Sequence, residues 1–336
     1  MESQKFRFSA KTVNYHFNAS LAHLKKIVPQ KKAVIITDEN IFNAHQKKLK
    51  GWDTIILKPG EEYKIQPTVD SIIDQLIKLK ADRQTTLIGM GGGVVTDLTG
   101  YTASIYMRGI EFGFVPTTIL AMVDACIGGK NGIDVGQFKN MVGTINQPQF
   151  LLYDTALLKS LPEREWNNGF AEIIKHAAIK DAALFKLLEE KDLAHFQKNK
   201  NSLQKLIQQN AMIKTKVVLG DEFEKGERRL LNFGHTLGHA LEKQYGLMHG
   251  EAVAIGMTYA ASISAKYTGF KQVAKLVLLI EKYGLPTTAG YDKKKTFEIL
   301  LNDKKKDAGD INYVLLEKLG KAVTKKISFE QLYNLL

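Results

Sequence analysis

Three histidines in the second half of the chain stand in a pattern that suits a metal. His235, His239 and His249 fall within fifteen residues of a 336-residue chain that has eight histidines. His235 and His239 are four residues apart, so they share one face of a helix that begins near Asn232. A lone histidine is usually structural, but a cluster of three favours a metal site. Spacing alone nominates His235 and His239 as the ligand pair.

A carboxylate ligand for such a metal has to come from another segment. The motif AEIIKH at 171–176 offers Glu172, and Lys175 lies on the adjoining face of the same segment. Carboxylate and imidazole groups together are typical zinc donors at sites that keep a position open for a substrate. The sequence therefore predicts a site built from at least two distant segments.

A glycine-rich segment in the first half has the context of a phosphate-binding loop. Gly89-Met-Gly-Gly-Gly93 follows a predicted strand at 85–88 and leads into helical spacing from Val94 to Gly100. Glycines let the backbone approach a pyrophosphate, whose charge meets the free N–H groups of a helix N-terminus. A tight turn alone would need one glycine. Because Val94 stands in the third glycine's place of G-x-G-x-x-G, we predict a nucleotide site of a family other than the Rossmann type.

Two polar loops follow neighbouring predicted strands. Asp38-Glu-Asn40 comes after the strand at 33–37, and Pro59-Gly-Glu-Glu-Tyr-Lys64 comes after the strand at 54–57. Ligands of open parallel sheets bind beyond the carboxyl ends of the strands. Acids and an amide at that edge suit ribose hydroxyls, and Lys64 suits the adenine side or a phosphate.

A second glycine-rich segment leaves two interpretations open. Gly128-Gly-Lys-Asn-Gly132 is followed by Lys139 and Asn140. A lysine in such backbone can act as a point charge for phosphate, although the spacing is not that of a Walker A loop. The same residues equally suit a surface hairpin.

The elements that must position these residues change character near residue 160. Before it, β-branched runs at 33–37, 54–57, 85–88 and 112–116 alternate with helical patterns, of which 69–79 is one. After it, amphipathic patterns follow at 172–190, 202–218, 232–245, 251–267 and 273–282. We predict an α/β domain with a largely parallel sheet over residues 1–158 and a mostly helical domain over residues 159–336.

Composition narrows the class of protein. Forty-seven Lys and Arg against 35 Asp and Glu leave a net charge of +12, which would draw phosphorylated or carboxylated ligands. Most basic runs are typical of solvated helix faces, with the run at 304–306 as the exception, and no nucleic-acid-binding signature is present. No stretch of about 18 apolar residues predicts a membrane span. The single cysteine, Cys126, excludes an intramolecular disulfide, so we expect a cytoplasmic protein.

Several segments of the chain resemble the 3-dehydroquinate synthase family. The segments that carry the resemblance run in the family's order over about residues 35–257. They are PGEEYK at 59–64, GGGVVTDLTGY at 91–101, YMRG at 106–109, VPTTILAMVDACIGGKNGID at 115–134, KNMVG at 139–143, GFAEIIKH at 169–176, and KTKVVLGDEFEKGERRLLNFGHTLGHALE through HGEAVAIGM from 214 to 257, with DKKK at 303–306 as a further match.

The resemblance implies an NAD-binding α/β domain, a helical domain that binds Zn²⁺ or Co²⁺, and an active site in the cleft between them. The family's metal ligands fall on Glu172, His235 and His249, which replaces the pair nominated by spacing. Its NAD contacts fall on Asp38, Asn40, Pro59, Gly60, Glu61, Glu62, Tyr63, Lys64, Gly91, Gly92, Gly93, Val94, Val95, Thr96, Asp97, Thr117, Thr118, Lys130, Lys139, Leu157, Leu158, Lys159 and Ser160.

The resemblance also implies which residues handle the substrate. His239 becomes a proton handler, Arg108 reaches the phosphate from the neighbouring subunit of a homodimer, and a lysine of 304–306 closes the phosphate site. The implied catalytic set is His239, Glu224, Lys130, Lys175, Lys214, Arg228, Asn232, Asp124, Asn140, Arg108 and Lys304.

The implied reaction converts 3-deoxy-D-arabino-heptulosonate 7-phosphate, a phosphorylated keto-acid sugar, to 3-dehydroquinate and phosphate. The steps are oxidation at C5 by NAD, phosphate elimination, return of the hydride and aldol closure of a carbocycle, so the net reaction is redox-neutral. Three alternatives stay open. They are a sister sugar-phosphate cyclase, a metal-dependent polyol dehydrogenase with net NAD turnover, and a silent NAD-binding scaffold.

Overall fold

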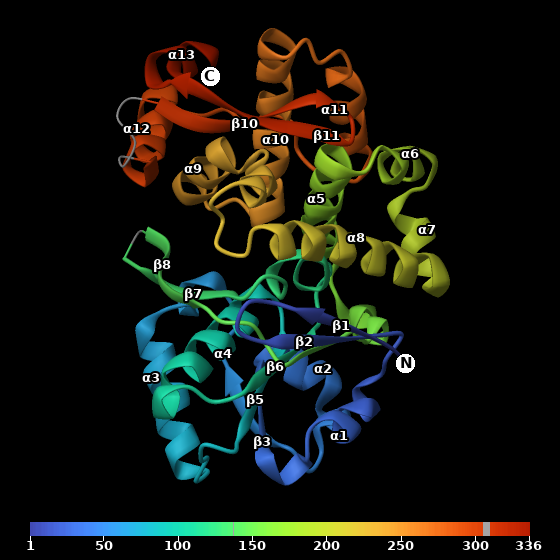
Figure 1. Cartoon of the computed structure of the whole chain (residues 1–336), viewed down its shortest axis with the longest axis vertical. Coiled ribbons are helices and arrows are strands. Elements are labelled where there is room, and N and C mark those ends of the chain that lie inside the picture. The colour runs from blue at the N-terminus through green and yellow to red at the C-terminus, as the bar shows by residue number, and fades with distance from the viewer. Residues whose placement is uncertain (137, 305–309) are drawn as a thin grey trace. The chain divides into compact units, whose positions relative to one another are not determined.

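The chain forms two compact units, each of which is described by itself. The computed structural model describes residues 1–136, 138–304 and 310–336, without the side chains of residues 302–304 (Figure 1). One unit comprises Met1–Trp166 and Lys200–Glu222, and the other comprises Asn167–Asn199 and Phe223–Leu336. This division differs from the predicted boundary at 158, because helix α8 (Lys200–Gly220) packs on the π-helical segment η5 (Ala121–Ala125) of the first unit. The boundary between functional domains stays a prediction.

The first unit contains the predicted, largely parallel sheet. Its seven strands lie in the order β1-β2-β9-β6-β5-β3-β4, and every neighbouring pair except β1 and β2 is parallel. The four predicted strands are confirmed as β3 to β6. The bounds are β1 (Glu2–Arg7), β2 (Thr12–Phe17), β3 (Ala33–Asp38), β4 (Asp53–Leu57), β5 (Thr86–Gly91), β6 (Phe112–Pro116) and β9 (Phe150–Leu152).

The β1–β2 hairpin was not predicted, although β2 carries a strand signal. Val13, Tyr15 and Phe17 alternate with more exposed residues, and this period of two is typical of a half-buried strand. β1 is mostly exposed along its length, as expected of an edge strand rich in polar residues. The central strands differ because both of their faces are covered. All six residues of β5 are buried.

Helices cover the sheet, and a hairpin extends from it. The predicted helix over 69–79 is confirmed as α3, which buries Val69, Ile72 and Leu76. Hairpin β7–β8 packs on α4. Residues 130–132 of the second glycine-rich segment form part of strand β7, so the backbone there is the hairpin of the second interpretation. The bounds are α1 (Leu24–Ile27), α2 (Glu39–Leu49), α3 (Gln66–Lys78), α4 (Gly93–Ile105), β7 (Lys130–Val135) and β8 (Phe138–Ile145).

The connectivity places a reversal of strand order between β3 and β5. From β3 the chain moves outward to β4, and it then returns to form β5 on the other side of β3. The carboxyl ends of β3 and β5 are therefore neighbours, and the Thr37 hydroxyl donates a hydrogen bond to the carbonyl of Met90 over 2.7 Å. Such a switch point is where open α/β sheets bind ligands.

The second unit is mostly helical, as predicted. Helices α9 and α10 pack closely because glycines line their contact. A Cβ added at Gly256 would lie 1.9 Å from the carbonyl oxygen of Gly234, and one added at Gly238 would lie 2.9 Å from that of Ala252. The bounds are α5 (Glu163–Lys180), whose last three-quarters belong to this unit, α6 (Ala182–Glu190), α7 (Leu193–Lys198), η7 (Glu227–Asn232), α9 (His235–Tyr245), α10 (His249–Tyr267), α11 (Val273–Lys282), α12 (Lys293–Lys304) and α13 (Phe329–Leu335).

A C-terminal hairpin interrupts this helical pattern and was missed by the sequence analysis. Strands β10 (Asp310–Lys318) and β11 (Lys321–Ser328) pair in antiparallel register, and β10 packs on α10. The strand alternation is partly hidden by the exposed Lys325 and Lys326, so this segment has the composition of a solvated helix face. None of the helices in the described part of the chain is long and apolar enough to span a membrane.

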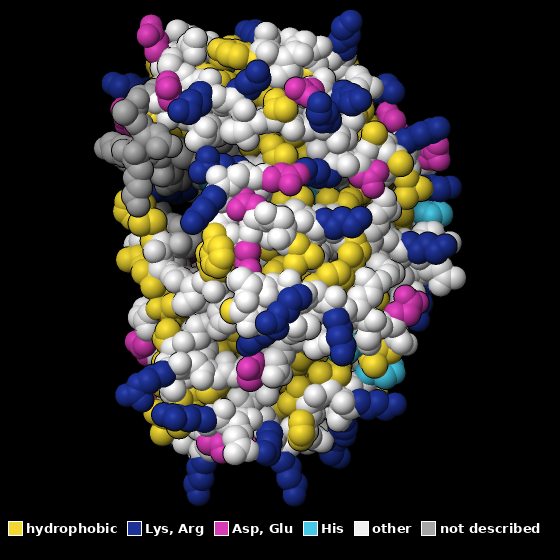
Figure 2. Space-filling view, viewed as in Figure 1, with side chains coloured by type: hydrophobic (Ala, Val, Ile, Leu, Met, Phe, Trp, Pro, Cys, Tyr) yellow, Lys and Arg dark blue, Asp and Glu magenta, His cyan; other side chains and the backbone are white. Residues whose placement is uncertain are grey.

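Basic residues are dispersed over the face of the molecule that Figure 2 shows. On the face shown in Figure 2, Lys and Arg side chains are scattered among acidic and uncharged ones and form no continuous stripe. Lys294 is an exposed member of the predicted solvated run at 293–295.

Candidate functional site

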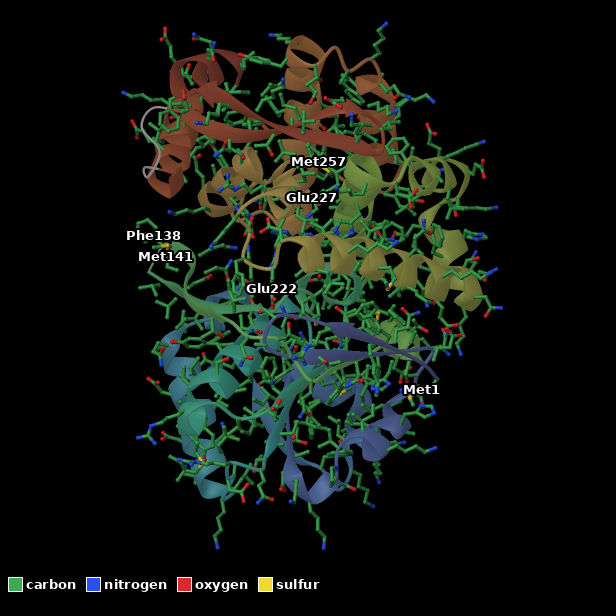
Figure 3. All side chains as sticks on the ribbon, viewed as in Figure 1. Met1, Phe138, Met141, Glu222, Glu227 and Met257 are labelled. Atoms are coloured by element: carbon green, nitrogen blue, oxygen red, sulfur yellow. The ribbon has the colours of Figure 1, made fainter. Side chains whose placement is uncertain are left out.

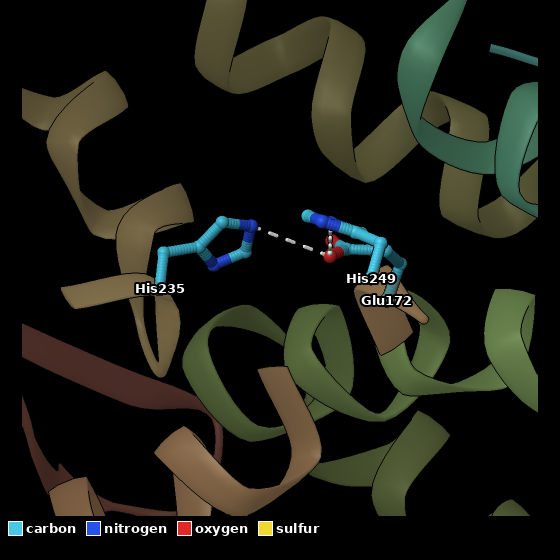
Figure 4. Close-up of side chains that lie close together, drawn as sticks. All are labelled: Glu172, His235 and His249. Carbon is cyan, nitrogen blue, oxygen red and sulfur yellow. Dashed lines mark hydrogen bonds and ion pairs between the residues drawn. The ribbon is translucent and has the colours of Figure 1, made fainter. Parts of the chain in front are cut away.

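Glu172, His235 and His249 meet in the second unit. One ligand atom from each lies within 4.8 Å of the others. Oε1 of Glu172 is 3.5 Å from Nε2 of His235 and 3.3 Å from Nε2 of His249, and Figure 4 shows the two rings directed toward this oxygen. Three donors from three helices converge on one point, an arrangement that suits a divalent metal ion.

One helix interior and two helix starts hold these three side chains in place. Glu172 is fully buried within α5, while His235 and His249 are the first residues of α9 and α10. Gly234 caps α9 in the left-handed region at φ 81°, where a Cβ would also lie 2.6 Å from the Met257 side chain. Only glycine satisfies both conditions, so the position before His235 is set by backbone geometry.

Both histidines use Nδ1 for a hydrogen bond to another residue, so that Nε2 of each ring is the nitrogen that faces Glu172. Nδ1 of His235 lies 3.2 Å from the carbonyl oxygen of Phe233, and Nδ1 of His249 lies 3.3 Å from Oε2 of Glu242. Both partners are acceptors, so Nδ1–H donates in each case. Nε2 of both rings is thereby presented as the metal-binding atom, and the residues fit a divalent cation.

The electrostatics of the cluster favour a positive charge beside the two carboxylates. Burial alone lowers the pKa of His249, but its hydrogen bonds with Glu172 and Glu242 outweigh burial and raise that pKa to about 10. For His235, burial and the nearby Lys175 ammonium lower the pKa well below its ordinary value. His235 is therefore neutral, whereas Glu172 and Glu242 stabilise a positive charge at His249, which a bound divalent cation would supply in place of the ring's second proton.

His239 lies beside this group rather than in it. Its ring centroid is 5.0 Å from that of His235 and 6.1 Å from that of His249, and the side chain is exposed. It forms a second potential ligand group only with Glu242 and His249. The geometry thus favours the ligand set implied by the resemblance over the pair nominated by spacing.

Four other predicted residues lie in the same unit. Lys175 is buried and paired with Glu172. Arg228 is 3% exposed on η7, a turn separated from the start of α9 by two residues. The amide nitrogen of Asn232 donates to Oε1 of Glu224 over 2.7 Å, and Glu224 has a left-handed backbone at φ 58°.

A polar cluster in the first unit joins residues that are far apart in the sequence. Nζ of Lys64, which is 5% exposed, lies 2.6 Å from Oδ2 of Asp97 and donates to Oδ1 of Asn140 over 2.7 Å. Lys139 approaches Glu61 to 3.5 Å. Burial opposes the charge of Lys64, but the carboxylates of Asp97, Glu61 and Asp134 together outweigh burial and raise the lysine's pKa. Residues that the resemblance assigns to NAD and to the substrate therefore share one cluster.

The predicted glycine loop ends β5 and begins α4 at the switch point. Gly92 is the N-cap and has no side chain to cap the helix, so the first N–H groups of α4 are available to an anion. At Gly91 a Cβ would lie 2.5 Å from the Val95 side chain. The buried Thr117 hydroxyl has no hydrogen-bond partner among the described residues, and Thr118 follows it. An uncapped helix and an orphaned hydroxyl fit a bound nucleotide phosphate.

Two further predicted segments flank this edge of the sheet. Asp38 ends β3 and caps α2 by accepting a hydrogen bond from the N–H of Ile41 over 2.9 Å. His45 of α2 lies 2.9 Å from the Ser160 hydroxyl, so η6 (Thr155–Ser160) runs beside α2. Within η6, Leu157 and Leu158 are buried while Lys159 and Ser160 are exposed. In the loop that follows β4, Gly60 has φ 125°. Pro59 precedes it, and Glu62 and Tyr63 lie in the short 3₁₀ turn between Gly60 and Lys64.

The remaining predicted residues divide into paired and exposed ones. Nζ of Lys214 is 2.8 Å from a carboxylate oxygen of Asp124 and donates to that residue's carbonyl over 2.8 Å. Lys130 and Arg108 are exposed, and Arg108 has a left-handed backbone at φ 69°. The side chain of Lys304 and residues Lys305 and Lys306 lie outside the described residues, so the predicted phosphate-closing lysine is not located.

Glu242 is a site residue that the sequence analysis missed. It follows His235 by seven residues and His239 by three, which are spacings that keep side chains on one helix face. It is 8% exposed, and its carboxylate contacts His249. The spacing signal was available, but acidic residues at such positions are common on solvated faces.

Comparisons with known proteins show which proteins this chain is similar to. A protein-family model described as 3-dehydroquinate synthase N-terminal matches residues 54–168, and one described as 3-dehydroquinate synthase C-terminal matches residues 169–306. The 3-dehydroquinate synthase of Campylobacter curvus is 38% identical over 333 residues, which cover 96% of this chain and 95% of that protein. That of Pelobacter propionicus is 41% identical over 289 residues, covering 84% and 80%.

A solved structure with the same fold contains bound ligands. It is a 2-deoxy-scyllo-inosose synthase complexed with carbaglucose-6-phosphate, NAD⁺ and Co²⁺, at 27% sequence identity and a TM-score of 0.86. The match covers 99% of this chain and 98% of that one. The fold described above is thus one on which a sugar-phosphate analogue, a dinucleotide and a divalent metal are bound together.

Proposed function

The chain belongs to the 3-dehydroquinate synthase family, and we propose that it converts 3-deoxy-D-arabino-heptulosonate 7-phosphate to 3-dehydroquinate and phosphate. The observation that carries this proposal is the convergence of Glu172, His235 and His249 on one point. These are the three residues on which the resemblance places the family's metal ligands. A silent scaffold has no need for these three donors in one buried place.

NAD is proposed to bind at the switch point of the first unit. The uncapped N-terminus of α4 supports this, since its N–H groups suit the pyrophosphate, as do the Thr117 hydroxyl and the Lys64 ammonium. The cofactor, when bound, supplies the hydride acceptor for C5 of the substrate and returns the hydride in the same cycle. Lys64 is held by Asp97 and Asn140, so its charge is fixed in position before any ligand arrives.

A divalent cation, Zn²⁺ or Co²⁺, is proposed to bind Glu172, His235 and His249. When bound, it supplies Lewis acidity that lowers the pKa of a substrate hydroxyl. The protein's own part is to fix the three donor atoms. Lys175 adds a positive charge at the carboxylate of Glu172, where it can orient an anionic substrate group.

The proposed substrate carries a carboxylate and a phosphate, and the chain supplies basic side chains for both. Arg228 and Lys175 lie in the second unit, and Lys214 and Lys130 lie in the first. Arg228 suits a planar carboxylate because its guanidinium can donate two parallel hydrogen bonds. His239, exposed beside the metal-ligand group, is proposed to take and return the proton at the substrate's reacting hydroxyl.

Release of phosphate from the heptulosonate phosphate tests this function. The purified chain is expected to release phosphate only when NAD and a divalent metal are both present, because oxidation at C5 is what makes the neighbouring proton acidic enough for elimination. Reactions that lack NAD, and reactions treated with a chelator and then resupplied with Zn²⁺ or Co²⁺, are the controls. Phosphate release that is independent of NAD would contradict the proposal.

We also propose that the protein is a homodimer in which hairpin β7–β8 contributes to the interface. The hairpin exposes Val135, Phe138, Met141, Val142 and Ile145, of which Met141 is 66% exposed. Figure 3 shows Phe138 and Met141 at its outer end, and Figure 2 shows hydrophobic side chains along that edge. Apolar side chains gathered on one exposed hairpin are typical of an interaction surface.

Replacing Met141 by glutamate is expected to convert the dimer to monomer, because a carboxylate would have to be buried without a partner. The measurement is molar mass by light scattering after size exclusion. Leu278 on α11 is 65% exposed and provides the matched control, since Leu278→Glu changes an equally exposed apolar residue elsewhere. An unchanged mass for Met141→Glu would remove the hairpin from the interface.

A further inference from the structure

Glu242 has no role in the reaction proposed above. It is nevertheless buried against His249, one of the proposed metal ligands. The residue lies in α9 and is 8% exposed. Its Oε2 is 3.3 Å from Nδ1 of His249, on the side of the ring opposite to the Nε2 that faces Glu172. A buried carboxylate in contact with a ligand histidine requires an explanation beyond packing.

We propose that Glu242 is a positioning residue that holds His249 in the orientation and tautomer in which Nε2 is the metal-binding atom. The inference rests on the proposed metal site and deepens it. An imidazole can bind a metal through either nitrogen, and the hydrogen bond made by the other nitrogen decides which. A carboxylate in that place also strengthens the ligand, because it stabilises positive charge on the ring.

The two ligand histidines differ in how much support they need. The side chain of His235 is 11% exposed, and its Nδ1 uses the nearby carbonyl of Phe233. The side chain of His249 is 26% exposed, so packing restrains it less. Its Nδ1 has a charged acceptor from a different helix, and a charge-assisted bond is the stronger restraint.

Glu242 contacts His249 because α9 packs against α10. Glu242 lies two turns after His235 on the same helix face, so one helix supplies both a ligand and the partner of the other ligand. The glycines at 234, 238 and 256 set the separation of the helices, and at these positions a Cβ would collide with backbone. The Glu242 carboxylate is thus fixed relative to the start of α10.

A competing explanation is that Glu242 binds a metal directly. His239, Glu242 and His249 also offer atoms within 4.8 Å of one another. That group shares His249 with the first one, so a metal held there would leave Glu172 and His235 without their third partner. The two explanations predict different behaviour for Glu242→Gln, because an amide oxygen still accepts a hydrogen bond but is a poor metal ligand.

The test is the zinc dissociation constant, measured by competition with a chromophoric chelator on the full chain. Glu242→Ala is expected to weaken zinc binding by about 10- to 100-fold, the range typical of lost outer partners of metal ligands. Glu242→Gln is expected to lose less than Glu242→Ala and much less than Glu172→Gln. Glu281→Ala is the matched control, since Glu281 lies in α11 of the same unit, is exposed and accepts a hydrogen bond from the Thr287 hydroxyl. It is expected to leave zinc affinity unchanged.

The absorption spectrum of the Co²⁺-loaded variants gives a second readout. If Glu242 positions His249, the bands of Glu242→Gln match those of the unchanged protein, because the ligand set is the same. Altered bands, or a loss of affinity equal to that of Glu172→Gln, would make Glu242 a ligand and overturn the proposal. So would unchanged affinity in Glu242→Ala. Should Glu242→Ala fail to fold, as judged by circular dichroism, Glu242→Gln decides. A smaller loss of affinity than in Glu172→Gln with retained bands supports positioning, and altered bands or an equal loss overturn it. A chain that binds no zinc even without substitution would instead contradict the proposed metal site.

Discussion

Replacing His249 by alanine is expected to remove the bound metal together with turnover, whereas replacing His239 is expected to remove turnover alone. His249 supplies one of three donor atoms that meet within 4.8 Å, so its loss leaves only two ligands from the protein. Two-ligand sites hold zinc weakly, and the Lewis acid on which the reaction depends is then lost. We expect turnover to fall on the order of 1,000-fold or more.

The measurement is metal content by elemental analysis after dialysis, alongside phosphate release. His239→Ala is the internal comparison because its ring is only 5.0 Å from that of His235. It should keep about one metal per chain and lose roughly 100- to 10,000-fold in rate, the usual worth of a general acid or base. The reverse pattern would restore His235 and His239 as the ligand pair nominated by their spacing.

Replacing Arg228 by alanine is expected to lower kcat/KM by at least about 100-fold, because a buried guanidinium that binds an anionic substrate group is worth several kcal/mol. Arg228 is 3% exposed. Lys294, on the exposed run at the start of α12, is expected to have no measurable effect when it is replaced by alanine. The prediction follows from where the basic excess lies, since a net charge of +12 by itself does not distinguish these residues.

Arg229 provides a control at the neighbouring position of the same turn. It is half-buried, so Arg229→Ala tests whether any loss of arginine in η7 disturbs the site. Arg228→Lys should recover part of the activity, since it keeps the charge and loses the paired hydrogen bonds. Equal losses from Arg228→Ala, Arg229→Ala and Lys294→Ala would show that the charge acts as a general field.

Much of the fold was predictable because the relevant signals are local. The strands at 33–37, 54–57, 85–88 and 112–116 combine β-branched composition with loop residues at their ends, and all four form the parallel part of the sheet. The two hairpins at the chain's ends were not predicted. β1 and β11 are largely exposed and rich in polar residues, so their apolar runs are short. The apolar run at 313–316 of β10 was a strand signal that the sequence analysis overlooked.

The site was predictable where a single segment contains the functional residues. It was less predictable where the contacts join residues that are far apart in the sequence. The glycine loop at 91–93 and the histidines at 235–249 stand out in the sequence. The bond between Lys64 and Asn140 spans 76 residues, and it depends on a hairpin folding back onto α4. Glu242 could not be separated from an ordinary surface glutamate until the glycine-lined contact of α9 with α10 placed it against His249.

The central claim, that this chain is a cyclase that uses NAD as a catalyst, is tested most directly by following phosphate and NADH in the same reaction. NAD is supplied at a small fraction of the substrate concentration. We expect phosphate release to continue until the heptulosonate phosphate is consumed, many turnovers per NAD, with no accumulation of NADH absorbance, because the hydride returns to C5 before the product leaves. NADH that appears in proportion to product, with the reaction stopping when NAD is exhausted, would contradict the account and make the chain a dehydrogenase on this fold.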